Sequence, residues 1–130
     1  MSEPDQELFN LAMSDESRPL LYAVQKHIEE NVAPITDEFF ALNEEKEDRW
    51  TWHPRQLELL GGAKAKAKES GLWNFFLPDA ETGEGLNNLD YAYIASELGK
   101  YALASESLNC SAPDTGNMEV LERVGTPEQK

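Results

Sequence analysis

Apolar residues recur at spacings of three and four positions between Leu20 and Phe39, and this spacing constrains the fold more than any other feature. The residues that follow it are Leu20, Leu21, Val24, Ile28, Val32, Ile35 and Phe39. Polar residues fill the positions between them, which predicts an amphipathic helix with one buried face. Ser14 or Ser17 can cap its start. Pro34 lacks a backbone donor, so we expect a kink there and a resumed helix towards Leu42.

Start and stop signals predict three further helices. They run from His53-Pro54 to Gly71, from Asn87 or Asn88 to Gly99, and from Ser111 to Gly125. Gly61-Gly62 in the first of these would let another backbone approach closely. No segment sustains strict apolar–polar alternation, and no Asn-Gly or Asp-Gly hairpin signal occurs. The sequence therefore predicts an all-α fold.

Composition and charge exclude several classes of protein. The 130 residues include 25 acidic and 11 basic side chains, a formal net charge of −14, which argues against nucleic-acid binding. A single cysteine, Cys110, cannot form a disulfide within the chain. No apolar run approaches the roughly 20 residues that span a bilayer, and the first residues do not resemble a secretory signal. We expect a soluble, intracellular globular domain.

The residues with chemical potential form no recognisable catalytic or metal motif. The two histidines and Cys110 lack metal-site spacing. We expect His27 to be exposed and His53 to start a helix, while a nucleophile–base pair of Cys110 with either histidine stays an alternative. Three tryptophans beside helix ends are expected to anchor the core, with stacking on a flat cofactor as the alternative: Trp50, Trp52 and Trp73. The basic cluster of Lys64, Lys66 and Lys68 reads as a solvated helix face, with an anion or partner contact left open.

Two stretches do not fit an ordinary loop. Residues 71–78 place apolar bulk in a connection, which we expect to be extended and buried, followed by a surface loop at Asp79–Gly85. Residues 108–118 mix small, polar and apolar side chains at a helix start, where free N–H groups could bound a ligand cavity. Thr126-Pro127-Glu128-Gln129 is a capping-box pattern, so we expect a further helix to begin there, unless the pattern is coincidental. The chain is thus expected to be a piece of a longer protein.

Four segments, in order, resemble the N-terminal domain of the acyl-CoA dehydrogenases. They are Lys68–Pro78, Tyr91–Gly99, Asn109–Leu121 and Gly125–Lys130. The third resembles most closely the branch that handles long, branched or hydroxylated acyl chains, and the second departs from the family's "EE(L/M)G" pattern at Ser96. The resemblance covers about residues 15–130 and leaves residues 1–14 as a flexible N-terminus. It implies an up-and-down helical bundle, truncated at the start of its last helix, without the family's middle β-domain and C-terminal four-helix domain.

The resemblance also implies a function. Family enzymes use FAD to dehydrogenate an acyl-CoA substrate between its α and β carbons and pass the electrons to an electron-transfer flavoprotein. The FAD motif and the catalytic glutamate fall outside this chain, so no catalytic, cofactor or metal residue is assigned here. The matching acyl-pocket residues are Leu108, Cys110, Ala112 and Met118, for which core packing is the alternative.

Further expectations follow from the family. The whole enzyme would be a homo-oligomer, dimeric or tetrameric, in the cytoplasm of a bacterium or in mitochondria or peroxisomes of a eukaryote. This chain would be inactive alone and would expose an apolar patch at Trp73–Leu77 and the last helix. The alternatives are a stand-alone all-α module for acyl binding or assembly, and an acyl-CoA oxidase relative.

Overall fold

The computed structural model describes residues 11–130. Within this range all regular structure is helical, which confirms the predicted all-α fold. The helices are α2 (Arg18–His27), α3 (Ala33–Ala41), α4 (Pro54–Glu69), α5 (Asn88–Leu98), α6 (Ala104–Ser107) and α7 (Asp114–Val124). None of the helices in this range has the length and apolar character needed to cross a bilayer.

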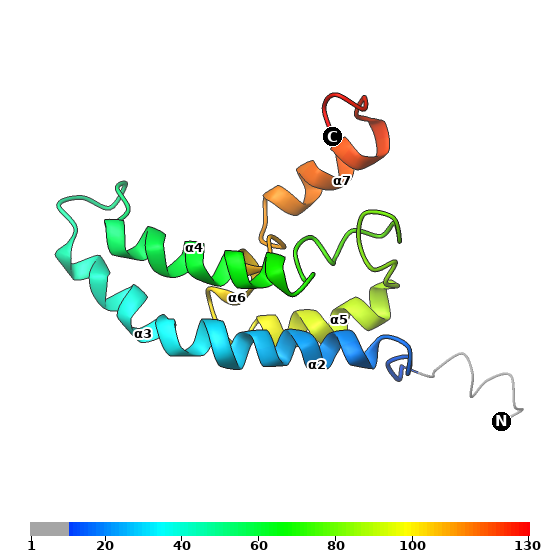
Figure 1. The fold of residues 1–130 in the computed structure, drawn as a ribbon, viewed down its shortest axis with the longest axis horizontal. Coiled ribbons are helices and arrows are strands. Elements are labelled where there is room, and N and C mark those ends of the chain that lie inside the picture. Colours follow the sequence, from blue (N-terminus) through cyan, green and yellow to red (C-terminus); the bar gives the residue numbers. More distant parts are fainter. Residues whose placement is uncertain (1–10) are drawn as a thin grey trace, which may run out of the picture.

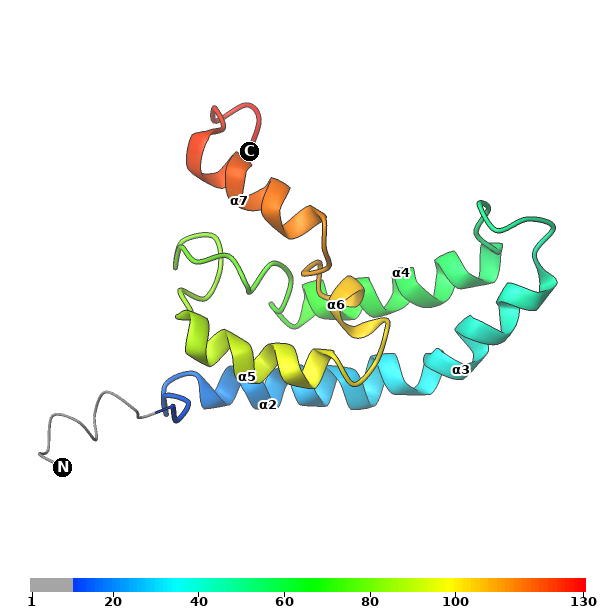
Figure 2. The same cartoon turned by 180° about the vertical axis from the view of Figure 1, so that it is seen from behind.

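Helices α2 and α3 form one long, bent rod, and α4 runs back along it (Figure 1). Helix α5 lies beside α2, and α6 contacts α4. The core between these helices contains side chains that are fully or almost fully enclosed, among them Val24, Val32, Phe75, Ile94 and Leu108. Helix α7 projects away from the other helices (Figure 2) and contains no buried residue. The bundle is therefore built from the segments before α7.

The bend in the long rod lies where Pro34 predicts it. A π-helical turn, Ile28–Val32, joins α2 to α3, and Pro34 occupies the first turn of α3. Because proline cannot donate a backbone hydrogen bond and its ring crowds the preceding turn, a wider turn before it relieves the conflict. The helix then resumes and ends in a 3-10 turn, Leu42–Glu45.

Helix α4 begins and ends at the predicted residues. His53 Nδ1 accepts from the backbone N–H of Arg55 at 3.1 Å, and the buried Gln56 side chain accepts from the His53 backbone. Gly71 follows the helix with a φ of +72°, a conformation that glycine adopts at little cost. The predicted close approach at Gly61-Gly62 is wrong, because a Cβ at either position would meet nothing within 4 Å and both residues face solvent.

The connection after α4 is buried, as predicted, but it is not extended. Four of its side chains belong to the core, namely Leu72, Phe75, Phe76 and Leu77. Asn74 has a φ of +63°, and its carbonyl accepts from the backbone N–H of Leu77 at 3.1 Å. The chain therefore turns at Asn74, which lets successive apolar side chains reach one core. Most of the loop at residues 79–85 is exposed, as predicted.

The predicted apolar patch is correct for the last helix and wrong for the connection. On α7 the exposed fractions are 59% for Val120, 45% for Leu121 and 77% for Val124. Phe75 is 1% exposed, because the turn at Asn74 folds the connection into the core. The unpartnered apolar surface of the described residues thus includes α7 but not this segment.

The prediction that the tryptophans anchor the core is wrong for Trp50 and Trp52, which are 80% and 50% exposed. Both lie in the turn between α3 and α4, where Asp48 caps the backbone N–H groups of Trp50 and Thr51. A loop of this kind lies outside the helical faces that form the core. Trp73 packs against the core and carries the Lys68 ammonium 4.3 Å from its ring centroid.

The other two lysines of the basic cluster pair within the chain. Lys64 binds Glu106 of α6, and Lys66 binds Glu69 at 2.8 Å on the exposed face of α4. The cluster therefore matches the prediction of a solvated helix face, with one lysine that also links α4 to α6.

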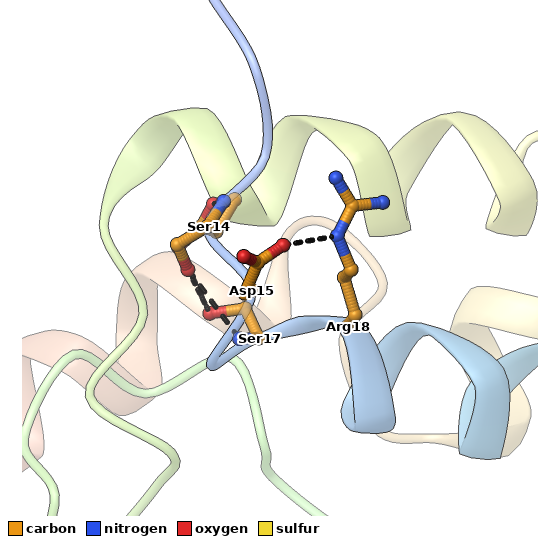
Figure 3. A network of polar contacts seen from close by, with 5 residues as sticks. Ser14, Asp15, Ser17 and Arg18 are labelled. Atoms are coloured by element: carbon orange, nitrogen blue, oxygen red, sulfur yellow. Dashed lines mark hydrogen bonds and ion pairs between the residues drawn. The ribbon is translucent and has the colours of Figure 1, made fainter.

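The segment before α2 is fixed to α5 by a buried carboxylate. Asp90 accepts hydrogen bonds from the Ser14 backbone at 2.8 Å, the Ser14 hydroxyl at 2.7 Å and the Ser17 hydroxyl at 2.9 Å. The Ser14 donors hold the pKa of Asp90 below its ordinary value. Figure 3 shows Ser14 beside Ser17 and the Asp15–Arg18 ion pair.

Residues 1–10 of the predicted flexible N-terminus lie outside the described residues. Of the remaining residues, Met13 is buried in the core and Ser14 is hydrogen-bonded to Asp90, and the flexibility of the segment stays a prediction. Such contacts act against flexibility at these two positions.

Candidate functional site

The two unusual stretches of the sequence lie against each other and are joined by two asparagines. The side-chain amide of Asn109 donates to Asn74 Oδ1 at 2.7 Å. The backbone N–H of Asn74 donates to the Leu108 carbonyl at 3.3 Å. Both asparagines are left-handed, with φ of +63° for Asn74 and +60° for Asn109. Asparagine tolerates this conformation better than most residues, so both turns form at little conformational cost.

A groove of about 310 Å³ opens between α7 and the connection after α4. Its apolar walls come from Leu77, Met118 and Leu121, with Asn74 among its polar lining. A hydrogen bond from the Thr82 hydroxyl to Glu122 joins the loop after the connection to α7 beside the groove. The volume falls near the lower end of small-ligand pockets.

The structure separates the four residues predicted for the acyl pocket. Met118 lines the groove and is half-buried. Leu108 and Cys110 belong to the core and do not line the groove. Ala112 is exposed and precedes Pro113 through a cis peptide bond. Acyl binding by these four residues stays a prediction, and Met118 has the placement that suits it best.

Two titratable side chains of the core region, Cys110 and Tyr91, are held neutral. Burial raises the pKa of the Cys110 thiol to about 12, and its Sγ donates to the Ser105 carbonyl at 3.4 Å. Burial also raises the pKa of Tyr91 to about 12. A thiol in such a site is a poor nucleophile at neutral pH, because the thiolate is the reactive form. Cys110 therefore lacks the activation that covalent catalysis requires.

His27 is buried, so the prediction that it is exposed is wrong. Its Nε2 lies 3.0 Å from Ser107 Oγ, and the Ser107 hydroxyl donates to the Ala104 carbonyl. With the Ser107 hydroxyl proton directed to the Ala104 carbonyl, we assign Nε2 as the donor in this contact, which corresponds to the neutral tautomer with its proton on Nε2. Burial lowers the pKa of His27. The imidazole joins α2 to α6 and is not paired with Cys110.

Sequence reasoning missed Asn74, which lines the groove, and Asn109, which contacts Asn74 and Met118. The available signal was an asparagine at a point where an apolar stretch must change direction, since asparagine is enriched at positive φ. It also missed His27, which lies three residues after Val24 and hence on the apolar side of the first helix.

Residues 11–130 contain no group of three or more His, Cys, Asp or Glu side chains that could hold a metal ion. The groove beside α7 does not fit FAD by itself. A flavin dinucleotide carries two phosphates, which proteins usually bind through free backbone N–H groups or basic side chains. The groove has only about 310 Å³, and its one basic lining residue, Lys130, is accompanied by the Glu122 carboxylate. No buried side-chain N or O atom of the described residues lacks a hydrogen-bond partner.

A family model described as "Acyl-CoA dehydrogenase, N-terminal domain" matches residues 14–130, nearly the whole chain. The chain belongs to the acyl-CoA dehydrogenase family. This confirms the resemblance found in the sequence.

Individual relatives agree with this assignment. The chain is 42% identical to mouse "Acyl-CoA dehydrogenase family member 10" over 123 residues, which cover 91% of this chain and 11% of the relative. It is 44% identical to chicken "Acyl-CoA dehydrogenase family member 11" over 120 residues, which cover 90% of this chain and 14% of the relative. The chain thus spans a small part of the relatives that it matches.

The fold is shared as well. A solved structure from Mycobacterium abscessus that is assigned to the acyl-CoA dehydrogenases matches with a TM-score of 0.77 and 42% identity, over 92% of this chain and 30% of that chain. The helical arrangement is therefore that of an acyl-CoA dehydrogenase N-terminal domain.

Proposed function

We propose that this chain acts as the N-terminal helical domain of an FAD-dependent acyl-CoA dehydrogenase. Such an enzyme removes hydrogen from the α and β carbons of an acyl-CoA thioester and delivers the electrons to an electron-transfer flavoprotein. The groups that react with the substrate would lie outside the described residues. The contribution of this domain would be to form the wall that receives the far end of the acyl chain.

The groove beside Met118 is the observation that carries this proposal. It is open, and leucine and methionine side chains line its apolar part. Burying an alkyl chain against such side chains is favourable by about 25 cal/mol per Å² of apolar surface removed from water. The methionine adds an adaptable surface, because its unbranched side chain can follow chains of different shape.

The neutral state of Cys110 and Tyr91 is compatible with a binding role. The Cys110 thiol and the Tyr91 phenol, both with pKa values raised to about 12 by burial, supply neither a nucleophile nor a base at neutral pH. A wall that only contacts an alkyl chain requires no such group. The domain would therefore affect which acyl chains are used rather than the reaction itself.

The test uses the protein produced from the complete reading frame, with ferrocenium as the electron acceptor. We expect reduction of the acceptor that depends on acyl-CoA, with the 2-enoyl-CoA product identified by mass spectrometry. Met118→Trp, which fills the groove, should raise KM for hexadecanoyl-CoA more than for butanoyl-CoA. Leu57→Ala, at an exposed position of α4, is the matched control and should change neither value.

Two results would contradict the proposal. Acyl-CoA binding without any electron transfer would favour the stand-alone binding module instead. Equal changes in KM for both substrates in Met118→Trp would show that the groove does not receive the distal part of the chain.

A further inference from the structure

Asn109 makes contacts that a loop residue does not need for its own turn. Its amide nitrogen lies 2.7 Å from Asn74 Oδ1 and 3.5 Å from the sulfur of Met118. A side-chain amide has two N–H donors, so one can serve each acceptor. Asn109 therefore links three segments: the turn after α4, the turn after α6, and helix α7.

The position of this amide is fixed by the backbone around it. The N–H of Asn109 donates to the Glu106 carbonyl at 3.2 Å, and the neighbouring Leu108 carbonyl accepts from Asn74. The left-handed conformations of both asparagines set the direction in which their side chains leave the backbone. The side-chain amide of Asn109 therefore has a defined position, from which it can orient a more flexible side chain.

Met118 is such a mobile group. A methionine side chain has three rotatable bonds, and its sulfur accepts only weak hydrogen bonds. Met118 is half-buried and packs against the core on one side, while the rest of α7 has no buried residue, so packing defines its side chain only in part. The contact with Asn109 favours the rotamers that hold the sulfur at the wall of the groove.

We propose that Asn109 is a positioning residue, which holds the Met118 side chain and thereby sets how much of the groove an acyl chain can occupy. This inference rests on the proposed function. It assigns a role in substrate selection to a polar side chain that need not touch the reacting atoms. The alternative is that Asn109 only stabilises the turn. In that case its substitution would change kcat/KM by the same factor for all substrates.

The experiment measures kcat/KM for butanoyl-CoA and hexadecanoyl-CoA in the holoenzyme. Asn109→Asp keeps the size of the side chain and the tolerance of positive φ but has no N–H to donate. Asn109→Gly keeps the backbone conformation and removes the side chain, so it covers the case in which the aspartate disturbs folding. Asn117→Ala, at an exposed position of α7, is the control.

We expect the ratio of the two kcat/KM values to change about tenfold in both Asn109 variants, the discrimination associated with about one methylene in an apolar pocket. The change should have the same direction as in Met118→Ala. The double variant Asn109→Gly/Met118→Ala should equal Met118→Ala alone, because Asn109 would act only through Met118. Asn117→Ala should keep the parent ratio.

Other outcomes overturn the inference in distinguishable ways. If both Asn109 variants keep the parent ratio while Met118→Ala shifts it, the positioning role is wrong and the proposed function survives. If the effects of Asn109→Gly and Met118→Ala add in the double variant, Asn109 does not act through Met118. If the parent enzyme shows no electron transfer from either substrate, the proposed function fails and this inference fails with it.

Discussion

Truncation of Leu108 tests whether the turn after α6 belongs to the core. The Leu108 side chain is fully enclosed, with 0% exposure, and packs in the same cluster as Phe75 and Leu72. Leu108→Ala would remove three carbon atoms from a site with no contact to solvent. Leu57→Ala makes the same chemical change on α4, where the side chain is 57% exposed.

The expected loss of stability follows from burial. Leucine-to-alanine changes in cores cost about 2–5 kcal/mol, because the lost transfer free energy is joined by that of the remaining cavity. Leu108 is fully buried in a turn that could relax in part, so we expect about 3 kcal/mol. For Leu57→Ala we expect less than about 0.5 kcal/mol, as for other exposed sites. The first value is a large part of the roughly 5–15 kcal/mol that stabilises an ordinary domain.

Urea unfolding followed by far-UV circular dichroism measures both variants. With a slope of about 1.5 kcal/mol per molar urea, Leu108→Ala should lower the midpoint by about 2 M. Leu57→Ala should lower it by less than about 0.4 M on the same slope. Equal shifts for the two variants would refute the placement of Leu108 in the core.

Three further predictions concern polar and titratable groups. Burial raises the pKa of Cys110 to about 12, so a maleimide at pH 8 should label the folded chain far more slowly than the urea-unfolded chain; equal rates would contradict this. Asp90→Ala should remove the protection of the Ser14 amide in hydrogen exchange, and unchanged protection would show that the carboxylate does not hold this segment. Burial lowers the pKa of His27 from its ordinary 6.5, so the unfolded chain binds this proton more readily than the folded chain. The free energy of unfolding should therefore fall as the pH is lowered from about 6.5 towards the pKa of the folded state, and His27→Gln should lose this dependence whereas His53→Gln should keep it.

The helices were predictable because their signals are local. The caps at His53 and Asn87 and the stop at Gly71 act on neighbouring backbone groups, so each can be identified from a few adjacent residues. The bend at Pro34 follows from the covalent structure of proline. The short helix α6 was missed, because four residues are too few to show a periodic pattern.

Burial outside the periodic segments was less predictable. Trp50 and Trp52 lie in a polar turn, but their large apolar side chains led to the prediction that they are buried in the core. Both tryptophans are exposed because the turn at Asp48 keeps their loop outside the bundle. His27 shows the opposite error, because a polar residue on the apolar side of a helix can be buried when a partner is available.

The geometry of the groove depends on contacts between distant parts of the chain, and local patterns do not contain them. A helix of four residues is not stable by itself, so α6 takes its position from its tertiary partners. Those partners are His27 of α2, which binds Ser107, and Lys64 of α4, which binds Glu106. The turn that follows α6 carries Asn109 against Asn74 and Met118. A substitution at His27, which is remote in sequence from the groove, would therefore alter the position of α6 and, through the turn after it, the geometry of the groove.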